Sequence, residues 1–138
     1  MANYKVVISK TNKTFPILGL NELLKAEKHT WNPRTKKTVV SNEVKKKNDE
    51  ICRICIRKTM RGVKIDKPIC CHYYIFVADK KHDRGNVYAS LEKSFLDALQ
   101  EVKVIKNDGF DDVIDSTFHT EVDRLNPRIE VIIEEVEI

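Results

Sequence analysis

The segment Ile69–Ala78 (ICCHYYIFVA) is a nearly unbroken apolar run in the middle of the chain. β-Branched and aromatic residues dominate it, a composition that favours a strand buried on both faces. It is too short to cross a bilayer as a helix. A strand of this kind needs neighbouring strands and covering helices. The run therefore predicts the centre of a sheet in an α/β protein.

Helical periodicity is present on both sides of this run. Ser41 is a good N-cap, and apolar residues at helical spacing predict a helix over residues 42–60, ended by Gly62. Asn86 is a second N-cap candidate, before a helix that runs to Gln100.

Three further strands are predicted from alternating or β-branched segments: Tyr4–Ser9, Val113–Val122 and Arg128–Glu137. Leu125–Pro127 is interpreted as the hairpin connection between the last two. Residues 28–40 are interpreted as a basic loop that ends in an extended piece at Lys37–Val40, and residues 15–24 as containing a short helix. The 138 residues fit one domain, 1–138, with an α/β (α+β) fold in which helices pack on a mixed sheet.

Charge is segregated along the chain. Residues 1–82 carry 19 Lys and Arg against 7 Asp and Glu, a balance of +12, whereas residues 83–138 carry 6 against 14, a balance of −8. This asymmetry favours a basic face for a polyanion and an acidic end for a cation.

The expected compartment, and with it the state of the cysteines, is inferred from two signals that the sequence lacks. No stretch approaches the roughly 18 apolar residues of a membrane span, and Met1–Ser9 lacks the apolar run of a signal peptide. We therefore expect a cytoplasmic protein with no membrane partner. In that compartment its four cysteines should be free thiols or metal ligands.

Cys52-x-x-Cys55 together with Cys70 and Cys71 suggests a zinc site. Cys52 and Cys55, however, fall within a predicted amphipathic helix. Cys70 and Cys71 are adjacent on a predicted strand and would point to opposite faces. We therefore expect buried free cysteines and no zinc.

Two acidic residues bracket the second predicted helix. Asp83 follows the end of the buried strand, which is where open α/β sheets place ligands. Asp108 lies between Asn107 and Gly109, and Gly109 is expected to turn with positive φ. Carboxylates that converge from a strand end and a loop can hold Mg²⁺, which phosphodiester cleavage uses to polarise the phosphate and activate water.

Lys93 and Asp97 are four residues apart on one face of that helix. This spacing is typical of a surface ion pair. It also allows a second role, in which Lys93 lies near a scissile phosphate and Asp97 holds the lysine in place.

Asp83, Asn86, Lys93, the triplet Asp97-Ala98-Leu99 and Asn107-Asp108 follow one another in the run KKHDRGNVYASLEKSFLDALQEVKVIKNDGF. This order resembles the active-site region of RusA-like Holliday junction resolvases, which are small phage and prophage endonucleases. That family's pattern is Asp-x-Asp-Asn, then a helix with Lys and Asp-Ala-Leu, then a loop that ends in an acidic pair or Asn-Asp. The sequence departs from the pattern at the second acid, where it has Gly85.

The resemblance implies a RusA-like homodimer that cuts four-way or branched DNA in recombination and repair, in a bacterial or phage-infected cell. It implies Mg²⁺, with Mn²⁺ able to substitute, held by Asp83 and Asp108. It also implies that Lys93 stabilises the charge on the phosphate, and that Asn86 and Asn107 support the site.

Gly85 has no carboxylate, so one Mg²⁺ ligand of the family pattern is unassigned. Glu92, Asp97, Asp111 and Asp112 are the available substitutes, and the alternative is a catalytically impaired protein that binds branched DNA without cutting it. Contacts to DNA phosphates are expected from eight basic residues: Arg34, Lys36, Lys37, Lys45, Lys46, Lys47, Lys80 and Lys81.

Overall fold

The computed structural model describes residues 3–9, 29–32, 37–40, 42–80 and 84–137. The elements in these ranges follow one another in the order β1 (Asn3–Ser9), β2 (His29–Asn32), β3 (Lys37–Val40), α2 (Asn42–Met60), β4 (Ile69–Val77), α3 (Arg84–Glu101), β5 (Val113–Val122) and β6 (Arg128–Glu135). The short helix predicted within residues 15–24 lies outside the described residues.

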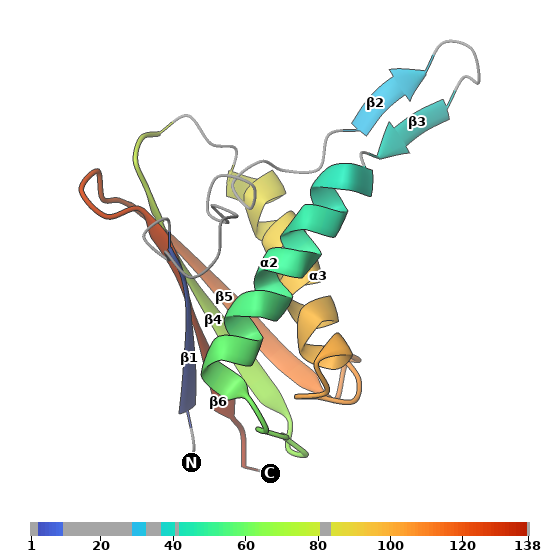
Figure 1. Cartoon of the computed structure of the whole chain (residues 1–138), viewed down its shortest axis with the longest axis vertical. Coiled ribbons are helices and arrows are strands. Elements are labelled where there is room, and N and C mark those ends of the chain that lie inside the picture. Colours follow the sequence, from blue (N-terminus) through green and yellow to red (C-terminus); the bar gives the residue numbers. More distant parts are fainter. Residues whose placement is uncertain (1–2, 10–28, 33–36, 41, 81–83, 138) are drawn as a thin grey trace.

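A four-stranded mixed sheet with the order β1-β6-β4-β5 forms the centre of the fold. β4 pairs in parallel with β5 and antiparallel with β6, and β6 pairs antiparallel with β1. Both helices lie on one side of the sheet (Figure 1). This arrangement confirms the predicted α+β fold with a mixed sheet and packed helices.

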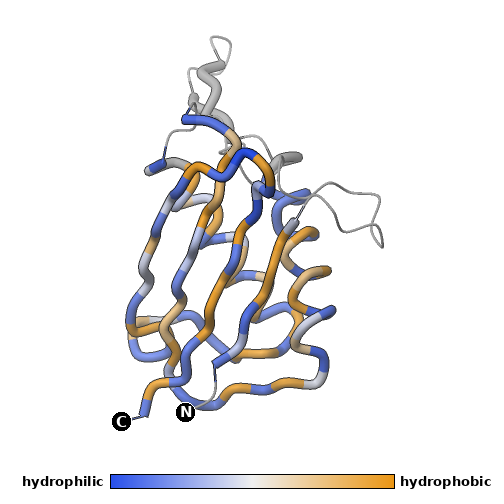
Figure 2. The backbone as a smooth tube through the Cα atoms, turned by 90° about the vertical axis from the view of Figure 1, so that its left-hand side faces the viewer, coloured by the Kyte–Doolittle hydropathy of each residue, from blue (hydrophilic) through white to orange (hydrophobic). Residues whose placement is uncertain are grey.

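β4 is the apolar run identified in the sequence. Its odd-numbered residues, from Ile69 to Val77, are all buried under the helices. Its even-numbered residues face the other side, where no further layer of the described chain covers the sheet, and Tyr74 there is 39% exposed. Figure 2 shows this open side, with hydrophobic and hydrophilic residues along the strands and a helix behind them. The strand is therefore buried on one face and only partly covered on the other, which corrects the prediction of burial on both faces.

α2 and α3 bury their apolar stripes against the sheet. Ile51, Ile56 and Met60 of α2, and Leu91, Phe95 and Leu99 of α3, are almost completely inaccessible. Gly62 ends α2 with a φ of 79°, a conformation that glycine adopts without strain. The bounds of α2 agree with the predicted 42–60.

Aromatic rings connect α3 to the parallel pair of strands. The Tyr73 ring of β4 stacks on Phe118 of β5 at 4.9 Å between centroids and meets Phe95 of α3 edge-on at 5.8 Å. Tyr88 of α3 also stacks on Phe118, with 4.7 Å between the ring centroids. Each such pair contributes about 0.5–1.5 kcal/mol beyond burial.

The connection between β5 and β6 is not the hairpin that Leu125–Pro127 suggested, because β4 lies between the two strands. The chain instead crosses the carboxyl end of β4, where the Asp123 amide donates to the Val77 carbonyl at 2.8 Å. Arg128 then binds Asp123 at 3.0 Å, and its guanidinium lies 3.9 Å above the Phe76 ring.

Two smaller predictions also need correction. Residues 29–32 form β2 and pair with β3 as a separate two-stranded sheet, whereas the sequence suggested a loop before Lys37. α3 begins at Arg84, so Asn86 lies in its first turn and is not the N-cap. In β2, pairing with β3 overrides the local preference of these residues for a loop.

Replacing Leu99 by Ala should lower the free energy of unfolding by about 2–5 kcal/mol, because Leu99 is completely buried and its removal leaves a cavity. Leu125→Ala is the matched control, since Leu125 is 98% exposed and should change stability by less than about 0.5 kcal/mol. Urea denaturation measures both, and equal losses would contradict this placement of the core.

Candidate functional site

Asp108 lies in the loop that joins α3 to β5. α3 ends where the amides of Val104 and Ile105 both donate to the Leu99 carbonyl, at 2.9 and 3.3 Å. The loop then runs to Val113, which pairs with Ile69 at the amino end of β4. Asp108 and Asn107 are both exposed in it. This loop therefore lies at the amino end of β4 and not at the carboxyl end, where the sequence placed its ligand site.

Gly109 and Asp112 shape this loop. The Gly109 amide donates to the Asp112 Oδ2 at 3.2 Å, and the amides of Asp112 and Val113 donate to the Gly109 carbonyl at 3.0 Å. Gly109 does not have the positive φ that was expected. A Cβ atom at Gly109 would lie only 3.2 Å from Asp112 Oδ2, so the glycine admits the carboxylate. Asp112 is thus engaged in its own turn, whereas Asp111 is exposed beside it.

The other end of α3 is distant from this loop. Asp83 lies outside the described residues, but the next residue, Arg84, begins α3. Because α3 has 18 residues, its ends are about 25 Å apart. A small cavity of about 110 Å³ at the carboxyl end of β4 is lined by Asp79, Lys80, Arg84 and neighbouring residues of β5. In one chain, Arg84 and Asp108 are therefore separated by the length of the helix.

Lys93 and Asp97 have different surroundings on α3. Lys93 is exposed, and its predicted partner Asp97 instead accepts from Lys45 Nζ of α2 at 3.3 Å. Lys45 also binds Asp49 at 2.7 Å, and these contacts outweigh burial and raise the pKa of Lys45. Lys45 therefore joins the two helices, and two carboxylates already compensate its charge.

The other predicted DNA contacts are distributed over several elements. Lys46 and Lys47 are exposed on α2, and Lys80 is exposed after β4. Lys37 is in β3, but its side chain is not described. Arg34, Lys36 and Lys81 lie outside the described residues. The side chain of Asn86 is likewise not described.

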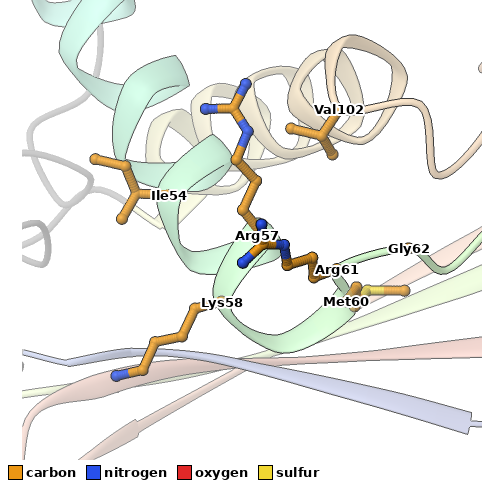
Figure 3. A pocket seen from close by; sticks show the side chains of 7 residues that line it. All are labelled: Ile54, Arg57, Lys58, Met60, Arg61, Gly62 and Val102. Atoms are coloured by element: carbon orange, nitrogen blue, oxygen red, sulfur yellow. The ribbon is translucent and has the colours of Figure 1, made fainter.

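A basic pocket between the carboxyl ends of α2 and α3 was missed by the sequence analysis. It is a cavity of about 650 Å³, lined by Ile54, Arg57, Lys58, Met60, Arg61, Gly62 and Val102. Figure 3 shows the Arg57 side chain between Ile54 and Val102, with Arg61 beside it and Lys58 extending in another direction. The signal in the sequence was Arg57 and Arg61, four residues apart at a helix end, which resembles ordinary compensation of the helix dipole.

This basic pocket and the loop with Asp108 adjoin the same pair of segments. The Ile65 amide donates to the Val104 carbonyl at 2.8 Å and holds residues 62–67 beside residues 102–107. The basic pocket includes Gly62 and Val102, whereas a second cavity of about 370 Å³ includes residues 65–67, 105–107 and Asp112. Figure 1 shows the ends of α2 and α3 and the start of β5 at one end of the molecule.

The cysteines have the surroundings of core residues. Cys52, Cys55 and Cys71 are buried, and burial raises the pKa of Cys52 well above its usual value, that of Cys55 to about 11 and that of Cys71 to about 12. Cys71 faces the helices, whereas Cys70 is on the open face of the sheet. The adjacent pair therefore points to opposite faces, as the strand pattern predicted.

Within the described ranges, no group of three or more His, Cys, Asp or Glu side chains is close enough to hold a metal ion. Neither described helix is long and apolar enough to cross a membrane. Comparison with protein-family models and with curated proteins found no match. A functional assignment therefore depends on the residues and their arrangement.

Lys45→Gln should lower the free energy of unfolding by about 1–2 kcal/mol, because it leaves the nearly buried Asp49 carboxylate without its cation. Lys46→Gln, an exposed neighbour with the same charge change, should have almost no effect. The difference should persist at neutral pH and disappear only as the pH rises through the raised pKa of Lys45. Equal stabilities in urea denaturation would contradict this role.

Proposed function

We propose that the chain is a Mg²⁺-dependent, RusA-like endonuclease that resolves four-way or branched DNA as a homodimer. The observation that carries the proposal is the position of the Asp108 loop beside the pocket of Arg57 and Arg61. Metal-dependent phosphodiester cleavage needs carboxylates for the cation and positive charge for the phosphate backbone. The order of acidic, amide and lysine residues between Asp83 and Asp108 supports the same class.

The spatial distribution of charge supports the choice of polyanion. The outer side of α2 is basic, whereas the open face of the sheet displays more acidic than basic side chains: Asp115, Glu121, Glu130 and Glu134 against Lys5 and Arg128. Each of the two cations is paired with a carboxylate of this face or its edge. DNA would be repelled from the open face and attracted to the helix side.

A site that uses both Asp83 and Asp108 requires two chains in this proposal. The start of α3, at Arg84, and the loop with Asp108 lie about 25 Å apart along one protomer. A two-fold axis can bring one end of a protomer beside the opposite end of its partner, and the same operation creates an identical second site. Two equivalent sites are also what paired cuts across a junction require.

The residues have distinct roles in the proposed reaction. Asp108 of one chain and Asp83 of its partner would hold Mg²⁺, which polarises the phosphate and activates the attacking water. Asp111 is the best candidate for the ligand missing at Gly85, because it is exposed next to Asp108, whereas Asp112 and Asp97 are already engaged. The exposed ammonium of Lys93 would stabilise charge that develops on the phosphate.

A junction-binding protein without catalytic activity is the second candidate. Gly85 favours it, because loss of one carboxylate can abolish metal binding while phosphate contacts remain.

Cleavage of a labelled synthetic four-way junction tests the proposal. The wild-type protein should nick it with Mg²⁺ and not with a chelator. Asp108→Asn and Lys93→Ala should each lose at least about a hundredfold in rate while still binding the junction. Asp115→Asn is the matched control, because this acid lies on the open face of the sheet and should leave cleavage unchanged. Binding without any Mg²⁺-dependent nicking would support the second candidate, and wild-type cleavage by Asp108→Asn would exclude Asp108 as a ligand.

Mixed dimers test whether the site is shared. Asp83→Asn and Asp108→Asn homodimers should both be inactive. A dimer with one chain of each variant, isolated through two different tags, should regain one complete site and therefore about half of the wild-type nicking. It should cut one strand and produce no paired products. If both acids act within one chain, each site of the mixed dimer lacks one acid and no activity returns.

A further inference from the structure

We infer that the outer side of α2, from Lys46 to Arg61, is a track for the phosphate backbone of a duplex DNA arm, with the Arg57–Arg61 pocket as its anchoring phosphate site. The identity of the polyanion as DNA rests on the proposed function. The track itself rests on exposure and charge.

The exposed side of α2 carries cations in its first half and again in its last turn. Lys46 and Lys47 are exposed in its first half, and Arg57 and Lys58 in its last turn. Arg61 and Lys64 continue the series beyond the helix end and are also exposed. From Lys46 to Arg57 the helix rises about 17 Å. That length spans about five phosphates of one B-DNA strand at 3.4 Å of axis each.

Acidic residues do little to neutralise this side. From Lys45 to Met60, the part of α2 whose side chains are described, Glu50 is the one exposed acid, and Asp49 is turned inward to Lys45. Arg53 binds the Glu101 carboxylate of α3 at 2.6 Å. Arg57 and Arg61 make no ion pair with another described residue, so their guanidinium groups are available to an external anion.

Compensation of the helix dipole does not explain the whole pattern. Cations in the last turn, such as Arg57 and Lys58, are favourable at a helix carboxyl end. Lys46 and Lys47, however, lie beyond the first turn and far from the carboxyl end of α2, so the dipole does not account for them. The pocket also has an apolar wall of Ile54 and Val102 beside the two arginines, whose guanidinium groups can make charge-assisted hydrogen bonds to a phosphate.

The experiment measures binding of the full chain to a linear duplex of about 20 base pairs and to a four-way junction, in chelator, over a range of salt concentrations. Each lost phosphate contact should reduce the slope of log K against log salt by about 0.9. Arg57→Gln/Arg61→Gln should therefore lower the slope by about 2 and weaken binding to both DNAs more than tenfold at 0.1 M salt. Thermal unfolding should be nearly unchanged, since both side chains are exposed.

Lys5→Gln/Arg124→Gln is the matched control. It removes the same net charge from two exposed positions of the sheet side and its connecting loop. If the two double variants lose affinity and slope equally, only net charge matters and the track is excluded. An unchanged slope in Arg57→Gln/Arg61→Gln excludes it as well.

The two proposals fail separately. Binding is measured in chelator and therefore does not depend on cleavage. If the wild-type protein never nicks the junction with Mg²⁺, but Arg57→Gln/Arg61→Gln lowers the salt slope as expected, the nuclease is refuted and the track is retained. A protein that nicks the junction with Mg²⁺, but binds equally well without Arg57 and Arg61, would retain the nuclease and refute the track.

Discussion

The burial of one face of β4 is the constraint on which the rest of the structure depends. Ile69, Cys71, Tyr73, Ile75 and Val77 are almost inaccessible, and the strand has hydrogen-bonded neighbours on both edges. Removing this much apolar surface from water requires a covering layer, which α2 and α3 provide. The stacked rings of Tyr73 and Phe118 then tie the parallel partner β5 to the same layer.

The parallel pairing of β4 with β5 decides which segments of the chain can lie close together. A parallel neighbour requires the chain to return along the full length of the sheet, and α3 makes this return. Residues before and after α3 consequently lie at opposite ends of the fold. Under the proposed function, an active site that combined Asp83 and Asp108 would therefore need two chains, as would symmetric cuts in a branched DNA.

The charge asymmetry of the sequence becomes a difference between two sides of the molecule. The amphipathic α2 has its apolar stripe on the sheet, so its many lysines and arginines can only face outward. Acidic residues of β5 and β6 alternate with partly buried residues in β5 and with buried residues in β6, and occupy the open face. Lys45 and Arg53 are exceptions on α2, because Lys45 binds Asp97 and Arg53 binds Glu101, so both belong to the contact with α3.

The sequence by itself determined the elements with strong periodicity. The bounds of α2, its end at Gly62, the position of β4 and the opposite facing of Cys70 and Cys71 followed from local signals. These were capping residues, residue composition and the period that a single helix or strand expresses. The mixed sheet under packed helices followed from the order of those elements.

Only the tertiary structure decided how distant segments meet. Leu125–Pro127 has the residues of a hairpin turn, yet it crosses β4, because strand order depends on long-range pairing. Asp97 suited Lys93 by local spacing but binds Lys45 of another helix. The separation of Asp108 from Arg84, and the pocket of Arg57 and Arg61 beside the Asp108 loop, depend on the direction of β5 and the packing of two helix ends. Local patterns do not encode these relations, since their energy comes from contacts between residues far apart in the chain.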